Sequence, residues 1–155
     1  MAYRVEGLAR ERFEPLFGLS EHELATRHAR RVRAGSSGGF PCRVTLDDAG
    51  EGESLILLNF VSHDVATPFR TAYAIYVREA DGAPPCYRDE VPAMLDSRTL
   101  GLRGFDDEGM LRGALLAIPG EADARIRELF GRPEVASIHA HNAAHGCFLA
   151  KVERD

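Results

Sequence analysis

Two histidines and a cysteine near the C-terminal end have the residue types and spacing best suited to chemistry. His139 and His141 are separated by one residue in segment 135–141, which alternates apolar and polar residues as a β-strand does. Both imidazoles are therefore expected on one face of this strand. Segment 147–153 alternates in the same way and begins with Cys147, and the five intervening residues end in Gly146. The pattern predicts a C-terminal β-hairpin.

The register of this hairpin follows from keeping its apolar side chains on one face. With His141 opposite Cys147, the apolar residues face one another: Ala140 with Phe148, Ile138 with Ala150, and Ala136 with Val152. A slip by one residue would mix the two faces. Directly opposed residues have Cβ atoms about 4.5–5.5 Å apart, so we expect the His141 ring to reach the sulfur of Cys147.

Three interpretations of this cluster are open. Imidazole and thiolate are ligands that zinc and other divalent transition metals take, so His139, His141 and Cys147 form a candidate metal set, which His145 or Cys42 could complete. Alternatively, Cys147 is a nucleophile and His141 its base, because a neighbouring imidazolium stabilises a thiolate. In the third interpretation the histidines lie on an ordinary polar sheet face and bind water or backbone groups.

Arginines in or beside the predicted strands could add a site for an anion. Arg43 and Arg70 are the candidates, although arginines on a sheet more often form surface ion pairs. If they converge on the polar face of the hairpin, they would bind a carboxylate or a phosphate. His63 could act there as acid or base, because the pKa of a free histidine is near neutrality, and Asn142 could orient the ligand or cap the turn. Whether a reaction is catalysed stays open.

Composition and charge exclude several classes of protein. The 155 residues include 19 Lys and Arg and 24 Asp and Glu, a net charge of −5, which argues against nucleic-acid binding. No apolar run is long enough to cross a bilayer, and the first residues form no apolar export segment, so we expect a cytoplasmic protein without a membrane partner. The three cysteines form no Cys-x-x-Cys pair, which excludes a zinc ribbon and a thioredoxin motif.

The elements that must position these residues show both helical and strand patterns. Ser20 and Glu23 form a capping box that opens a helix through about Arg30, whose exposed face and exit would carry the arginines at 27–33. A second helix with one apolar face covers 122–130. The remaining periodic segments are typical of strands: 3–5, 42–46, 55–60, 73–78, 100–105, 110–116 and the two of the hairpin. We predict a single α+β domain, residues 1–155, with a largely antiparallel sheet, two principal helices packed on one face and a C-terminal β-hairpin.

Several short segments keep the order of a known family along nearly the whole chain. They are Pro41-Cys42-Arg43, Pro68-Phe69-Arg70, Ala74–Glu79, Ser97-Arg98, His139–Ala143 and Gly146-Cys147-Phe148. Together they resemble the bacterial domain of unknown function 1203 family. The resemblance implies a single-domain bacterial protein with no established activity, and it supplies no catalytic assignment. The family often has histidine where this chain has Tyr73, and His145 and Cys86 lie outside its pattern.

The sequence therefore predicts a site for a small anionic molecule or a metal ion, built on the C-terminal hairpin. The rival interpretation is a non-catalytic interaction or sensor domain, in which an exposed sheet edge or helix meets a partner protein.

Overall fold

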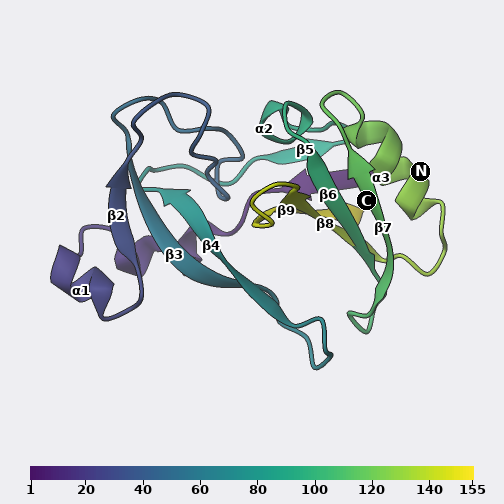
Figure 1. Cartoon of the computed structure of the whole chain (residues 1–155), viewed down its shortest axis with the longest axis horizontal. Coiled ribbons are helices and arrows are strands. Elements are labelled where there is room, and N and C mark those ends of the chain that lie inside the picture. Colours follow the sequence, from purple (N-terminus) through teal and green to yellow (C-terminus); the bar gives the residue numbers. More distant parts are fainter.

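The computed structural model describes residues 1–155, which form nine strands and three α-helices (Figure 1). The strands are β1 (Tyr3–Glu6), β2 (Arg30–Arg33), β3 (Ser54–His63), β4 (Thr71–Arg78), β5 (Cys86–Arg88), β6 (Leu100–Phe105), β7 (Leu111–Ala117), β8 (Ser137–Asn142) and β9 (Phe148–Arg154). The helices are α1 (Glu21–Ala25), α2 (Ala93–Asp96) and α3 (Ala122–Phe130), and short 3-10 turns cover Arg10–Arg12 and Glu14–Leu16.

The strands form two antiparallel sheets. The six-stranded main sheet has the order β5-β1-β9-β8-β6-β7, and the three-stranded small sheet has the order β2-β3-β4. Figure 1 shows the small sheet and the main sheet side by side, with the β8–β9 turn between them. The α+β class, the antiparallel pairing and the C-terminal β-hairpin are confirmed. The strands, however, divide between two sheets.

Helix α3 covers one face of the main sheet. Its buried residues recur at the spacing of a single helical face: Ala122, Ile126, Leu129 and Phe130. They belong to the same apolar cluster as Ile138 and Ala140 of β8 and Val152 of β9. This cluster is the larger of the two principal cores, and the apolar face of the hairpin packs into it.

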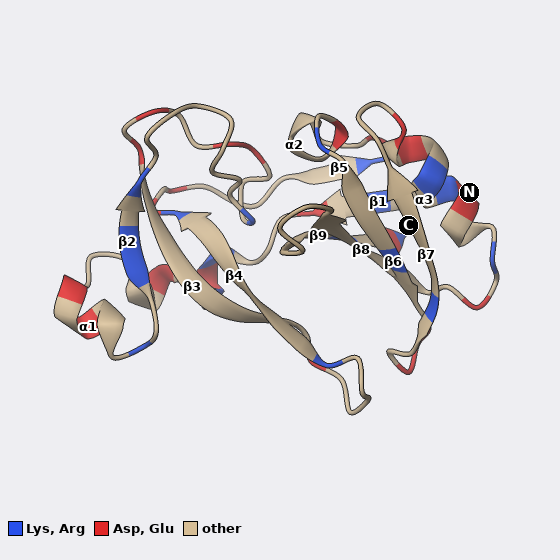
Figure 2. Cartoon of the chain, in the orientation of Figure 1, with Lys and Arg blue, Asp and Glu red and all other residues tan.

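Helix α1 is shorter than predicted and belongs to the small sheet. The capping box of Ser20 and Glu23 is present, but the helix ends at Ala25 and His28 adopts a left-handed backbone conformation with φ 55°. Residues 30–33 then pair with β3 as strand β2. The basic residues at this point lie on a strand, visible as the blue stretch in Figure 2, and are not the exit of a helix. Leu24 packs with Ile56 of β3, so α1 and α3 cover different sheets.

The predicted strand at 42–46 is a tight turn. The amide of Leu46 donates to the carbonyl of Cys42 at 3.0 Å, and Leu46 has a positive φ of 53°. Alternation alone misidentified this segment, because Cys42, Val44 and Leu46 are all buried without being extended. The turn matters for the site, because it aims Arg43 between the two sheets.

A second core lies between the sheets. It includes Phe13, Phe60, Ile75 and Val77 from the small-sheet side and Phe148 from β9. The face of the hairpin opposite α3 is therefore covered by the small sheet over part of its area. None of the helices is both long and apolar enough to span a membrane.

Candidate functional site

The C-terminal hairpin has a different register from the predicted one. Ala140 lies opposite Ala150, and a β-bulge then places His141 opposite Phe148. The pairing is shifted by two residues, which leaves the same residues of β8 on the apolar face. The extra residue of the bulge, Leu149, joins the main core, while Phe148 turns to the opposite face. The predicted pairing of His141 with Cys147 is therefore wrong.

The two histidines lie inside the layer between the sheets. His139 is 2% exposed and His141 is 4% exposed. The His139 ring packs edge-on against Phe105 and Phe148, with centroids 5.1 and 5.4 Å away, and the His141 ring contacts Tyr73 at 5.1 Å. They form part of an aromatic layer and do not line an open polar face.

Burial keeps both imidazoles neutral. Burial, together with the smaller effect of the nearby His63 and His141 rings, lowers the pKa of His139 to about 3. Burial also lowers the pKa of His141, although the hydrogen bond to the Gly146 carbonyl, 3.0 Å from Nδ1, opposes the shift. Nδ1 of His139 and Nε2 of His141 are buried without a hydrogen-bond partner in the protein.

The metal set and the nucleophile–base pair suggested by the sequence are not assembled. No group of three or more His, Cys, Asp or Glu side chains is placed so that it could hold a metal ion, so His139, His141 and Cys147 do not form one. The sulfur of Cys147 contacts Arg43, whereas His141 bonds to Gly146. The bulge at Leu149 and the packing of the histidines against the small sheet keep the two imidazoles away from the sulfur of Cys147.

Arg43 is the buried centre of a different cluster. Its side chain is 1% exposed. Nε donates to the Phe148 carbonyl at 2.8 Å, Nη1 to the Pro41 carbonyl at 2.6 Å, and Nη2 to the sulfur of Cys147 at 3.3 Å. Burial lowers the pKa of Arg43, and the neighbouring Cys147 opposes this shift, but an arginine in a protein remains charged. No carboxylate pairs with this guanidinium.

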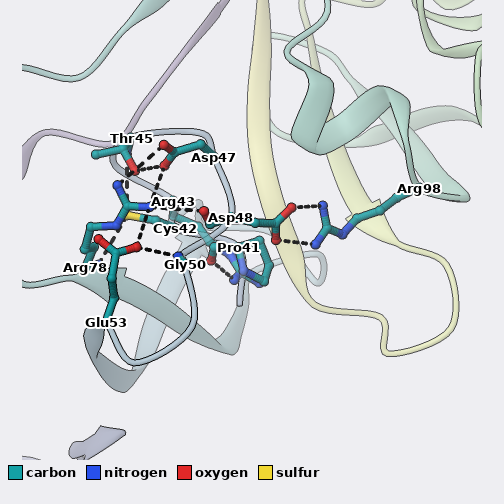
Figure 3. Close-up of polar contacts among 10 residues, drawn as sticks. All are labelled: Pro41, Cys42, Arg43, Thr45, Asp47, Asp48, Gly50, Glu53, Arg78 and Arg98. Carbon is teal, nitrogen blue, oxygen red and sulfur yellow. Dashed lines mark hydrogen bonds and ion pairs between the residues drawn. The ribbon is translucent and has the colours of Figure 1, made fainter. Parts of the chain in front are cut away.

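Ion pairs between other residues fix the position of the loop that carries Arg43. Figure 3 shows Arg78 contacting Asp47 and Glu53 at one end of the loop. At the other end, Arg98 binds both oxygens of Asp48, at 2.5 and 3.0 Å. Arg98 follows α2 in the chain, so this bidentate pair ties the loop to the main-sheet half of the molecule. The surrounding arginines are thus neutralised, and Arg43 is not.

A cleft of about 630 Å³ opens beside Arg43 and Cys147. We call it the Arg43 cleft. One wall is the loop 38–43, the second is the edge of β4, and the third is the β8–β9 turn. Side chains that line it, besides Arg43 and Cys147, are Pro41, Leu57, Tyr73, Ala74, Tyr76, Arg98, Asn142 and His145. Its lining contains no acidic residue, and its size is typical of a small-molecule site.

Only part of the predicted anion site converges in this cleft. Arg43, Asn142 and Cys147 do, and the Asn142 side-chain oxygen also caps the turn by accepting from the amides of Ala144 and His145. Arg70 pairs with Asp64 in the exposed β3–β4 loop and does not line the cleft.

His63 lies in a separate pocket of about 350 Å³ that His139 also lines. Its Nε2 is 3.0 Å from the Gly109 carbonyl. His63 therefore does not join Arg43, because the long β3 strand carries it to the far end of the layer between the sheets.

Sequence reasoning did not assign the β4 wall of the cleft. Tyr73 and Tyr76 lie on β4, and neither forms a motif with Arg43. Gly38 and Gly39 also line the cleft, and the glycine-rich run 35–39 was the one signal of a segment able to approach a ligand closely.

Comparison with known families gives one match. The model of a family described as "Protein of unknown function (DUF1203)" matches residues 39–154. The matched range contains Arg43, Asn142 and Cys147, and it also contains the whole of β4 and the C-terminal hairpin. No curated protein and no solved structure matches the chain.

Proposed function

The chain belongs to the DUF1203 family, and we propose that it binds a small anionic molecule in the Arg43 cleft. The observation that carries this proposal is a buried guanidinium without a counter-ion. Arg43 is 1% exposed, and its three hydrogen-bond partners are two backbone carbonyls and a sulfur. Such an uncompensated charge is costly in a folded protein. A bound anion would compensate it.

The charges around the cleft favour an anion over a cation. Arg43 and Arg98 are the arginines that line it, and no Asp or Glu does. Arg98 is already paired with Asp48, so the unbalanced positive charge is that of Arg43. In partly desolvated surroundings a charge-assisted hydrogen bond to an anion is about twice as strong as a neutral one.

The apolar part of the lining sets the second requirement on the ligand. Leu57, Tyr73 and Tyr76 give the cleft aliphatic and aromatic walls, and about 630 Å³ exceeds what a bare inorganic ion fills. We therefore infer an organic acid with an apolar or aromatic body, bearing a carboxylate or a phosphate.

Cys147 places a sulfur next to the anion position. Its Sγ accepts a hydrogen bond from Arg43 Nη2, and its side chain is partly exposed. The same cleft could thus hold an electrophilic ligand against a nucleophile, but the proposal concerns binding and does not require turnover.

The proposal is tested by titrating the ¹⁵N-labelled protein with 3-phenylpropanoate and phenyl phosphate, and with phenethylammonium as the cationic control. We expect saturable shifts at the Arg43 Nε–H, the Asn142 side-chain amide and the Cys147 amide with the two anions, and none with the cation. Shifts confined to the exposed arginines of β2, or no saturable shift with either anion, would overturn it.

A further inference from the structure

The edge of β4 that forms one wall of the Arg43 cleft is an unpaired strand edge. Strand β4 pairs with β3 on its other side and has no partner strand on this side. Figure 1 shows this edge facing the β8–β9 turn. An unpaired edge presents backbone donors and acceptors that an extended chain can use.

Two hydrogen bonds show which β4 residues direct their backbone groups away from β3, toward the free edge of the strand. The Tyr76 carbonyl accepts from the Arg43 amide at 3.2 Å, and the Arg78 amide donates to the Cys42 sulfur at 3.2 Å. Both groups therefore point away from β3. Because this direction alternates along an antiparallel strand, the amide and carbonyl of Ala74 point the same way. Ala74 lines the cleft.

The loop segment 41–43 already occupies the continuation of this edge. Cys42 pairs with Tyr76 in the parallel direction, so the segment runs alongside β4 as an added strand would. A short extended ligand lying beside Ala74 in the same direction would end with its terminal group facing Arg43. The edge thus supplies backbone pairing and Arg43 supplies charge for the end of the chain.

We infer that the ligand of the Arg43 cleft is the carboxyl-terminal end of a short peptide or an N-acyl amino acid. This inference rests on the proposed anion site and names its ligand class. The amide of Ala74 donates to a ligand carbonyl, and the Ala74 carbonyl accepts from a ligand amide. The carboxylate is held by Arg43, and the last side chain, on the face of Tyr73, packs against that ring.

The charge of the cleft favours a chain end with a free carboxylate over other extended chains. The lining has an unbalanced guanidinium and no acidic residue, which suits a chain end that carries a carboxylate and disfavours an amidated or basic end. A strand from the middle of a protein would need to continue past Arg43, where Pro41 and Cys42 already lie on the edge.

The experiment compares three probes by isothermal titration calorimetry: N-acetyl-Ala-Phe, its C-terminal amide, and 3-phenylpropanoate. We expect N-acetyl-Ala-Phe to bind at least ten times more tightly than either of the others. The variant Ala74→Pro removes the amide that points into the cleft while leaving the β3 pairing, because proline is tolerated on a strand edge. It should abolish the tighter binding of N-acetyl-Ala-Phe relative to 3-phenylpropanoate.

Ala72→Pro is the matched control, because Ala72 points the same way but does not line the cleft. A change in the ligand repeats the test without altering the protein. N-methylation of the Phe amide removes the donor of the ligand and should weaken binding of the peptide to the affinity of 3-phenylpropanoate. Equal affinity for the peptide and for 3-phenylpropanoate would overturn the inference and leave the anion site standing. Failure of both anions to bind would overturn the anion site as well.

Discussion

The guanidinium of Arg43 donates to the sulfur of Cys147 across 3.3 Å, although the two residues are 104 positions apart in the chain. This contact joins the turn at 42–46 to the residue that precedes β9, and both residues line the Arg43 cleft. It brings a buried positive charge and a nucleophilic sulfur together at one cleft.

Arg43 contributes to folding as well as to binding. Arg43→Met leaves the carbonyls of Pro41 and Phe148 without their donor, and we expect a loss of about 3 kcal/mol in the free energy of unfolding, because each buried unpaired group costs about 1–3 kcal/mol. Arg70→Met is the control, since the Arg70–Asp64 pair is exposed and should change stability by less than about 0.5 kcal/mol. Urea denaturation of both variants measures this, and equal losses would contradict the role of Arg43.

The three cysteines should differ in reactivity. Cys86 is exposed, Cys147 is partly exposed and Cys42 is buried. We expect N-ethylmaleimide to modify Cys86 and Cys147 in the native protein and Cys42 only after unfolding, as peptide mass spectrometry would show. In a Cys86→Ser variant, saturating 3-phenylpropanoate should slow the modification of Cys147. In Cys147→Ser the same ligand should leave Cys86 labelling unchanged, and unprotected Cys147 would count against its place in the cleft.

The charge of the β8–β9 turn should control anion affinity. Asn142→Asp keeps an oxygen that can accept from the amides of Ala144 and His145, so we expect little change in stability. It adds a negative charge to the cleft lining, which should weaken 3-phenylpropanoate binding about five- to tenfold at low salt. Calorimetric titration at two salt concentrations checks this, and unchanged affinity would mean that the anion lies elsewhere.

The buried neutral state of His139 makes stability depend on pH. Its pKa is about 3 in the folded protein and near 6.5 when unfolded. The unfolded chain therefore binds the extra proton first, and this contribution to stability is complete above about pH 6.5 and lost as the pH falls toward 3. His139→Leu should flatten the dependence between these values by up to about 1.4 kcal/mol per pH unit.

Urea unfolding at pH 7.5 and 5.5 measures this difference. His139→Leu should also be no less stable than the natural chain at pH 7.5, because it removes a buried nitrogen without a partner. His22→Gln is the control, since His22 is exposed on α1 and its replacement should leave the pH profile as it was. Identical profiles for all three proteins would show that His139 is not held neutral.

Local patterns in the sequence were sufficient for several elements. The capping box of Ser20 and Glu23 starts α1, and the apolar spacing of 122–130 is that of α3. Both depend on residues within a few positions of one another. Where a local pattern had two solutions, it failed: three buried residues at alternate positions in 42–46 indicated a strand, and the backbone there is a turn with Leu46 at positive φ.

What the sequence by itself determined is which residues of β8 share a face. Because side chains alternate along a strand, His139 and His141 point to one face of β8 and Ile138 and Ala140 point to the other face, whatever the pairing with β9. Only the tertiary structure decided the rest. A slide of two residues preserves the faces, so register depended on the bulge at Leu149 and on the small sheet that covers the histidines. The contact of Arg43 with Cys147 depended on the same packing, because long-range contacts are set by how whole faces fit together and not by the spacing of residues in the chain.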